Sequence, residues 1–185
     1  MIILYVILAV VAVVIIWMIA VYNGLVGLKT RTDEAASDID VQTKRRYDLI
    51  NKLLPTVKGY AKHEQSVFEN VTKARSAAMG ANTLADKAAK ENMLTDTLKS
   101  LFAVAENYPE LKANVNFLDM QTQITETEDK IEASRRFYNG NVRDFNIKIM
   151  VFPNNMIANT LGFKKYDMYE ASAAEKEDVK VDFDK

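Results

Sequence analysis

The sequence predicts an all-α protein in which an N-terminal transmembrane helix continues into the first long helix of an antiparallel three- or four-helix bundle. Residues 1–28 carry no charged side chain. Beyond them, apolar and small residues recur every three or four positions, which places them on one face of a helix. Only six glycines and three prolines occur in the 185 residues, so the chain contains few helix breakers.

The predicted membrane anchor is the apolar run at residues 2–21, which contains no glycine, proline or charged residue. At 1.5 Å per residue this run spans about 30 Å, the thickness of the hydrocarbon core of a bilayer. The residues that mark the anchor and its interfaces are Ile2, Leu8, Ile15, Trp17, Val21 and Tyr22. A cleaved signal peptide is the alternative, but it requires a basic residue before the run and an A-x-A-like cleavage site.

Charge and composition limit the function classes. Lys29 and Arg31 follow the anchor and no basic side chain precedes it, so the positive-inside rule places the C-terminal part in the cytoplasm and the N-terminus outside. The 24 basic and 25 acidic side chains nearly balance, so no net field favours nucleic acid. The sequence has no cysteine, which excludes disulfides, zinc–thiolate sites and thiol nucleophiles.

The first long helix is predicted from a stripe of apolar and small residues that runs from Leu25 to Ala74. Pro55 and Gly59 form a candidate kink within it, because proline removes one backbone hydrogen bond and clashes with the carbonyl four residues earlier. One interpretation is a kink in a helix that continues to Met79. The other is a true break or a functional hinge.

A second helix is predicted at residues 84–107. A third is predicted to begin at Asn114 or Asn116, both good caps, and to run to residue 151. A short fourth helix around Ile157 is predicted to end at Gly162. The stripe of the third helix runs from Phe117 to Phe152. The sequence therefore predicts three parts. Residues 1–28 form the transmembrane helix and its interface, residues 29–163 form the helical bundle, and residues 164–185 form a charged, mobile tail. The tail ends in an apolar–polar alternation at 179–183 that would suit a docking strand.

Several charged residues are candidate contacts between helices or subunits. The strongest basic run, residues 44–46, can meet acidic groups of a neighbouring subunit or a second membrane, or be neutralised by nearby aspartates one turn away. Its own membrane lies about 35 Å away along a straight helix. Glu128 and Arg135 lie on the apolar stripe, so they must be paired or reach solvent. The candidate set is Asp40, Lys44, Arg45, Arg46, Asp48, Arg135 and Arg136.

No catalytic constellation is recognisable. His63 is the single histidine, and although His63-Glu64 resembles the start of the zinc motif H-E-x-x-H, Val67 stands where the second histidine would be. The sequence contains no Walker loop, dinucleotide fingerprint or nucleophile elbow. We therefore predict no enzymatic activity, and no catalytic, cofactor or metal site.

Many short stretches, in order along nearly the whole chain, resemble the LemA family. They are YNGLV (22–26), IDVQ (39–42), KRRYDLI (44–50), TVKGYAKHE (56–64), VTKAR (71–75), AENYPELKAN (105–114), NFL (116–118), RRFYN (135–139), VRDFN (142–146), FP (152–153) and VKVDF (179–183). The sequence departs from the family at one place. The family usually has Pro-Asn directly after the residue that matches Ile50. Here Asn51-Lys52 stand at those positions, and Pro55 comes about one helical turn later.

The resemblance implies a single-pass protein of the bacterial inner (cytoplasmic) membrane with a helical cytoplasmic domain and no established enzymatic activity. One branch of the family, the magnetosome Q-type proteins, is tied to building intracellular membranes. Other members are encoded near a membrane zinc metalloprotease.

Two functional hypotheses follow. The first is a non-enzymatic scaffold that contacts the lipid bilayer, forms homo-oligomers and shapes or organises the membrane; it follows from the stripe that leaves the anchor without interruption. The second is an adaptor that regulates a membrane protease or signalling protein. It follows from the alternating C-terminal end and from the resemblance.

Overall fold

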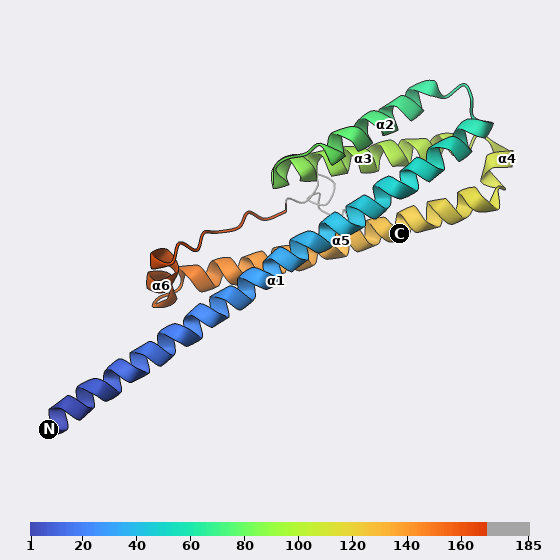
Figure 1. Cartoon of the computed structure of the whole chain (residues 1–185). Coiled ribbons are helices and arrows are strands. Elements are labelled where there is room, and N and C mark those ends of the chain that lie inside the picture. The colour runs from blue at the N-terminus through green and yellow to red at the C-terminus, as the bar shows by residue number, and fades with distance from the viewer. Residues whose placement is uncertain (170–185) are drawn as a thin grey trace, which may run out of the picture. The chain divides into compact units, whose positions relative to one another are not determined.

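The computed structural model describes residues 1–169, and this part of the chain contains six helices and no strand (Figure 1). The predicted all-α class is confirmed. The helices are α1 (Ile2–Tyr60), α2 (Gln65–Met79), α3 (Leu84–Ala105), α4 (Pro109–Lys112), α5 (Val115–Met150) and α6 (Asn154–Thr160). The predicted anchor and the first bundle helix both belong to α1, with no interruption between them.

The chain folds into two compact units, to which both α1 and α5 contribute. The anchor unit comprises Met1–Val41 and Glu132–Met168, and the bundle unit comprises Gln42–Ile131 together with Tyr169. The predicted boundary between anchor and bundle, at residue 28, therefore differs from the division that the contacts define.

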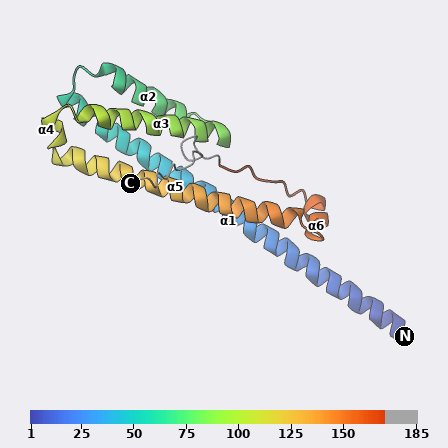
Figure 2. The same ribbon diagram turned by 180° about the vertical axis from the view of Figure 1, so that it is seen from behind.

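The bundle unit contains the C-terminal part of α1, α2, α3, α4 and the N-terminal part of α5. Short connections reverse the chain direction from each long helix to the next, which gives the predicted antiparallel arrangement, with α2 and α3 side by side (Figure 2). The long helices contribute apolar side chains three or four residues apart to one core, and α4 contributes Leu111. The most deeply buried members are Ile50, Leu53, Val57, Ala61, Val71, Leu94, Leu101 and Leu111.

Of the two interpretations of Pro55 and Gly59, the structure has a break near Gly59 and not a helix that continues to Met79. α1 includes Pro55 but ends at Tyr60, one residue after Gly59, and α2 begins at Gln65 after a turn. The turn lets α2 fold back, so that Phe68 and Val71 bury against the core that α1 contributes to. Ala61 in the turn is itself fully buried, so the three-to-four spacing of apolar residues passes through the break unchanged.

The later helices agree with the predictions to within a few residues. The hydroxyl of Thr83 accepts a hydrogen bond from the Asp86 amide at 3.2 Å at the start of α3. The Asn114 carboxamide oxygen accepts one from the Phe117 amide at 3.1 Å at the start of α5. Both side chains cap amides that lack a partner within their helix. The short helix α4 was not predicted; it begins at Pro109, where a missing N–H costs nothing.

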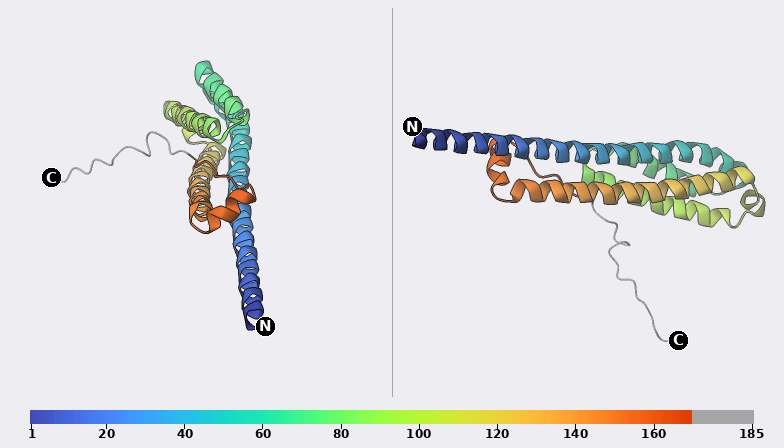
Figure 3. Two further views of the ribbon diagram at one scale, coloured as in Figure 1. Left: turned by 90° about the vertical axis from the view of Figure 1, so that its left-hand side faces the viewer. Right: turned by 90° about the horizontal axis from the view of Figure 1, so that it is seen from below.

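The anchor unit pairs the N-terminal part of α1 with the antiparallel C-terminal part of α5, and α6 lies beside them (Figure 3). A small core joins the three helices through Val21, Leu25, Phe145, Ile149, Ile157 and Ala158. Residues after α6 also belong to this unit. The segment from Lys164, expected to be a mobile tail, contains Tyr166, whose backbone N–H and C=O both bond to the Asn146 side chain. The alternating pattern at 179–183 lies outside the described residues.

Candidate functional site

The anchor is an exposed apolar surface. Every side chain from Met1 to Ile16 is exposed, Trp17 is half-buried and Val21 is the first buried residue. Within residues 1–169, α1 is the one helix long and apolar enough to cross a membrane. Its backbone groups are paired within the helix, which is the requirement for a segment in hydrocarbon. Ile2, Leu8 and Ile15, predicted as membrane contacts, accordingly face the surroundings rather than the protein.

A polar cluster lies just beyond the anchor. Lys29 Nζ contacts Asp33 Oδ2 at 2.7 Å, and the Tyr166 hydroxyl donates to Asp33 Oδ1 at 2.6 Å. The Lys29 hydrogen bond, followed by that of Tyr166, lowers the pKa of the Asp33 carboxyl. The cluster ties the segment after α6 to α1, so Tyr166 helps to hold α6 beside the end of the anchor.

The bundle unit contains a buried ionic network. Arg46 of α1 pairs with Glu91 of α3 through Nη2 and Oε2, and neither side chain has exposed surface. The second guanidinium nitrogen, Nη1, pairs with Glu128 of α5, whose side chain is 32% exposed. One guanidinium thus meets two carboxylates from two other helices. Burying such charges is tolerated only when each is paired and hydrogen-bonded.

Two hydroxyl groups also belong to the network. The Thr95 hydroxyl accepts a hydrogen bond from Arg46 Nη1 at 2.9 Å and donates to Glu128 Oε1 at 2.7 Å. The Tyr47 hydroxyl donates to the second oxygen of Glu91. Burial and this bond to Glu91 raise the pKa of Tyr47 well above its ordinary value, so its proton is retained. Both carboxylate oxygens of Glu91 therefore have a partner.

The basic run 44–46 does not act as one surface patch. Lys44 is exposed and pairs with Asp48 at 3.0 Å, as the neutralisation interpretation expected, while Arg45 is exposed and Arg46 is buried. On α5, Arg136 is exposed and pairs with Glu132, and Arg135 is half-buried. Asp40 is exposed. Of the predicted contact residues, Arg46 is thus placed in the core of the bundle.

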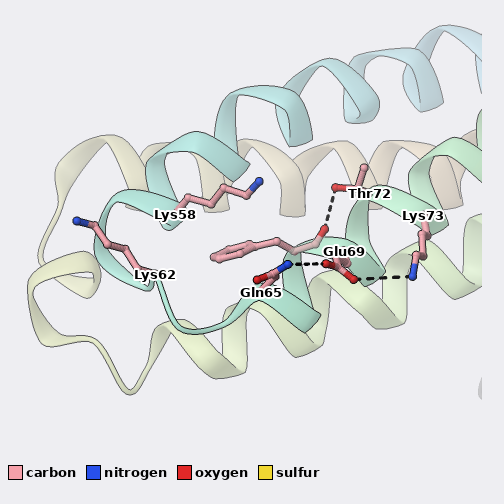
Figure 4. A pocket seen from close by; sticks show the side chains of 7 residues that line it. Lys58, Lys62, Gln65, Glu69, Thr72 and Lys73 are labelled. Carbon is pink, nitrogen blue, oxygen red and sulfur yellow. Dashed lines mark hydrogen bonds and ion pairs between the residues drawn. The ribbon is translucent and has the colours of Figure 1, made fainter.

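A shallow pocket of about 530 Å³ lies between the end of α1 and α2 (Figure 4). Lys58, Lys62 and Lys73 line it together with a single acid, Glu69. Lys58 Nζ lies 5.5 Å from the centre of the Phe68 ring, which is a cation–π distance. Glu69 contacts Gln65 at 2.9 Å and Lys73 at 3.9 Å. With three lysines and one acid among its lining residues, the pocket suits an anionic group rather than a cation.

Sequence reasoning missed Glu91, Thr95 and the pocket. Glu91 lies in the sequence Lys90-Glu91-Asn92, which resembles a solvated face, and only its spacing of three from Leu94 indicated a buried position. Glu128 was placed on the apolar stripe of its helix, and Arg46 lies four residues before the buried Ile50 on α1; these positions were the available signal that both side chains face the core. In the described part of the chain, no group of three or more His, Cys, Asp or Glu residues is placed to hold a metal ion.

These features are those of a helical membrane protein: an apolar helix suited to a bilayer continues into a helical bundle with an ionic core. A family model for the LemA family matches residues 35–183, and the chain belongs to this family. Protein LemA of Metamycoplasma hominis is 31% identical, over 85% of this chain and 72% of the relative. Magnetosome proteins MamQ 1 and MamQ 2 of Paramagnetospirillum magneticum are each 25% identical, over 83% of this chain and 66% of each relative. The chain thus spans about two thirds of the magnetosome relatives.

Proposed function

We propose that the protein is a non-enzymatic, membrane-anchored helical scaffold that self-assembles and shapes or organises the bacterial membrane. In this proposal it crosses the inner membrane once, with its C-terminal part in the cytoplasm, as the placement of Lys29 and Arg31 after the anchor favours. The relatives named as magnetosome proteins support a role at membranes.

The observation that carries the proposal is the extent of α1. A single helix, Ile2–Tyr60, supplies both the apolar anchor and one helix of the bundle core. No loop separates the anchor part of α1 from the part that belongs to the bundle core. Packing of anchors side by side would therefore also bring bundles of neighbouring copies together, which is the property required of a scaffold.

The anchor offers a face for such packing. Ala20, Gly24 and Gly27 are three or four residues apart and so share one side of α1. A side-chain carbon added at Gly24 or Gly27 would meet no atom within 4 Å, so this face is uncovered within one protomer. Small residues at this spacing let two helix backbones approach closely in a membrane.

The open space at Gly24 allows a selective test. Gly24→Leu should leave the protomer folded, since no atom lies within 4 Å of a Cβ at this exposed position and leucine favours the helix. It should hinder close approach of a second anchor. Native mass spectrometry of the full-length protein released from lipid nanodiscs is expected to show oligomers for the wild type and fewer for Gly24→Leu.

The control for this experiment is Val26→Leu, a substitution at the same depth but on another face of α1. It should leave the oligomer distribution unchanged. A wild-type protein that is strictly monomeric at every protein-to-lipid ratio would contradict the scaffold proposal.

The pocket favours a second candidate, an adaptor or regulator of a membrane protease or signalling protein. Its three lysines would engage an acidic segment of such a partner. The variant Lys58→Glu/Lys62→Glu should then lose a membrane protease that co-purifies with the wild type, as identified by mass spectrometry. Lys99→Glu, another exposed lysine of the bundle unit, is the matched control. Equal recovery of the protease with both variants would count against the adaptor.

A further inference from the structure

The corner between α5 and α6 exposes apolar side chains that the sequence pattern would have placed inside. Phe152 continues the buried stripe of α5 but is 78% exposed. Met150, Val151, Met156 and Leu161 are also exposed around the same corner. Isolated exposed apolar residues are ordinary on soluble proteins, but a cluster of five on one short segment marks an interaction surface.

The corner lies against the last turn of the membrane anchor. Ile157 and Ala158 of α6 share a small core with Val21 and Leu25 of α1, and Trp17 packs against that core. Phe163, just after α6, contacts the ring of Tyr22 edge-on at 6.5 Å between ring centres. Trp17 and Val21 belong to the apolar run itself, so α6 reaches the depth at which that run ends.

This depth determines the surroundings of the corner. If residues 2–21 fill the hydrocarbon core, Leu25 lies four residues further, or about 6 Å along the helix, within the headgroup layer. The antiparallel α5 ends beside Val21 and Leu25, so the chain beyond Met150 turns at the bilayer boundary. Apolar side chains at this depth can enter the acyl region, whereas in water they would remain unfavourably exposed.

The flanking charges fit the same boundary. Lys164 and Lys165 follow Phe163, a few residues after the end of α6, and both are exposed. Interfacial segments commonly combine apolar side chains that enter the bilayer with lysines that contact anionic headgroups. Tyr166, held by Asn146 and Asp33, follows the two lysines and keeps this segment against α1.

We propose that the α5–α6 corner, led by Phe152 and Met156, is a second membrane-contacting element that inserts into the interface of the leaflet where the anchor ends. The protein then enters the bilayer at two places: the anchor crosses it, and the corner enters one leaflet alone. This inference requires that residues 2–21 span a bilayer, but it does not require self-assembly.

The test uses spin labels on single cysteines in the full-length protein, reconstituted into vesicles of phosphatidylcholine and phosphatidylglycerol. Labelling is unambiguous because the sequence contains no cysteine. The labelled variants are Met156→Cys and Phe152→Cys at the corner, and Ile15→Cys in the anchor. Met93→Cys on α3 is the matched control, since Met93 is 61% exposed and Met156 is 62% exposed.

Oxygen dissolves in lipid, and a water-soluble nickel chelate does not. The ratio of label collisions with oxygen to collisions with the chelate is therefore expected to be several-fold higher at positions 152 and 156 than at position 93. Position 15 should give a still higher ratio.

Three outcomes would overturn the proposal. Corner labels that match position 93, with a lipid-exposed label at position 15, would place the corner in water. Corner labels shielded from both oxygen and chelate would show that protein, such as a second copy, covers it. A label at position 15 without lipid exposure would remove the membrane span on which the inference rests.

Discussion

Arg46 of α1 and Glu91 of α3 form an ion pair in which neither side chain reaches solvent, although 45 residues separate them in the sequence. Glu128 of α5 joins the same guanidinium, and Arg75 of α2 donates to the Tyr47 carbonyl at 3.1 Å. All four long helices of the bundle unit therefore meet at this level. Because apolar stripes can slide by a helical turn, buried ionic groups of this kind can fix which residues face each other.

Removing Arg46 should strongly destabilise the bundle. Arg46→Met leaves the buried Glu91 carboxylate without its cation, a change that typically costs about 3–5 kcal/mol in unfolding free energy. Lys44→Met, which removes the exposed pair with Asp48, should cost less than about 1 kcal/mol. Urea unfolding of the full chain in detergent, followed by far-ultraviolet circular dichroism, measures both. Equal effects would show that the buried pair has no special role.

Replacing both charges should recover much of that loss. In Arg46→Met/Glu91→Met no unpaired charge remains at the centre, and Glu128 can turn its partly exposed carboxylate to solvent. Apolar replacements of a whole buried pair are often neutral or stabilising. The double variant should therefore be more stable than Arg46→Met alone in the same urea titration. A double variant as unstable as the single one would mean that packing, rather than charge, sets the cost.

Tyr47 should make the bundle sensitive to alkali. Burial, followed by its bond to Glu91, raises the pKa of Tyr47 in the folded protein above the ordinary value of 10.0. A raised folded-state pKa contributes stability that is present below pH 10 and is lost as pH rises towards the folded-state value. Above pH 10, the unfolding free energy of the wild type should fall with pH more steeply than that of Tyr47→Phe. The difference in slope should be at most about 1.4 kcal/mol per pH unit, the value for one proton. Urea titrations above pH 10 would show identical slopes for both proteins if Tyr47 were not involved.

Two glycines should respond oppositely to alanine. Gly140 lies inside α5 with nothing within 4 Å of an added carbon, so Gly140→Ala should stabilise the protein by about 0.5–1 kcal/mol. Gly162 lies two residues after the end of α6 with φ 74°, a left-handed conformation that costs an L-residue about 1 kcal/mol or more. Gly162→Ala should therefore destabilise it. Thermal unfolding should shift up for the first variant and down for the second.

The sequence was most informative where one physical rule dominates. The anchor follows from the length of the apolar run and from its lack of charged residues. The three-to-four spacing of apolar residues predicted core residues such as Ile50, Val57, Ile131 and Phe145. The candidate cap at Asn114 predicted where α5 begins. Each of these signals is local, so it survives without knowledge of the rest of the fold.

The features that escaped prediction depend on contacts between distant segments. The end of α1 at Tyr60 leaves the apolar spacing in register, so this spacing could not decide between a kink and a true break near Gly59. Glu91 is recognisable as a core residue only after α1 and α5 place Arg46 and Glu128 beside it. Phe152 matches the buried stripe of α5, yet α5 ends at Met150 and the next residues turn away from the core.

Cryo-electron microscopy of the full-length protein in lipid vesicles tests the central claim most directly, because it shows the number and spacing of copies and the shape of the membrane together. The scaffold account predicts clusters or ordered arrays in which anchors pack side by side and the surrounding bilayer is curved. It also predicts that Gly24→Leu disperses these clusters. Isolated protomers in membranes of unaltered curvature, at all protein densities, would contradict it.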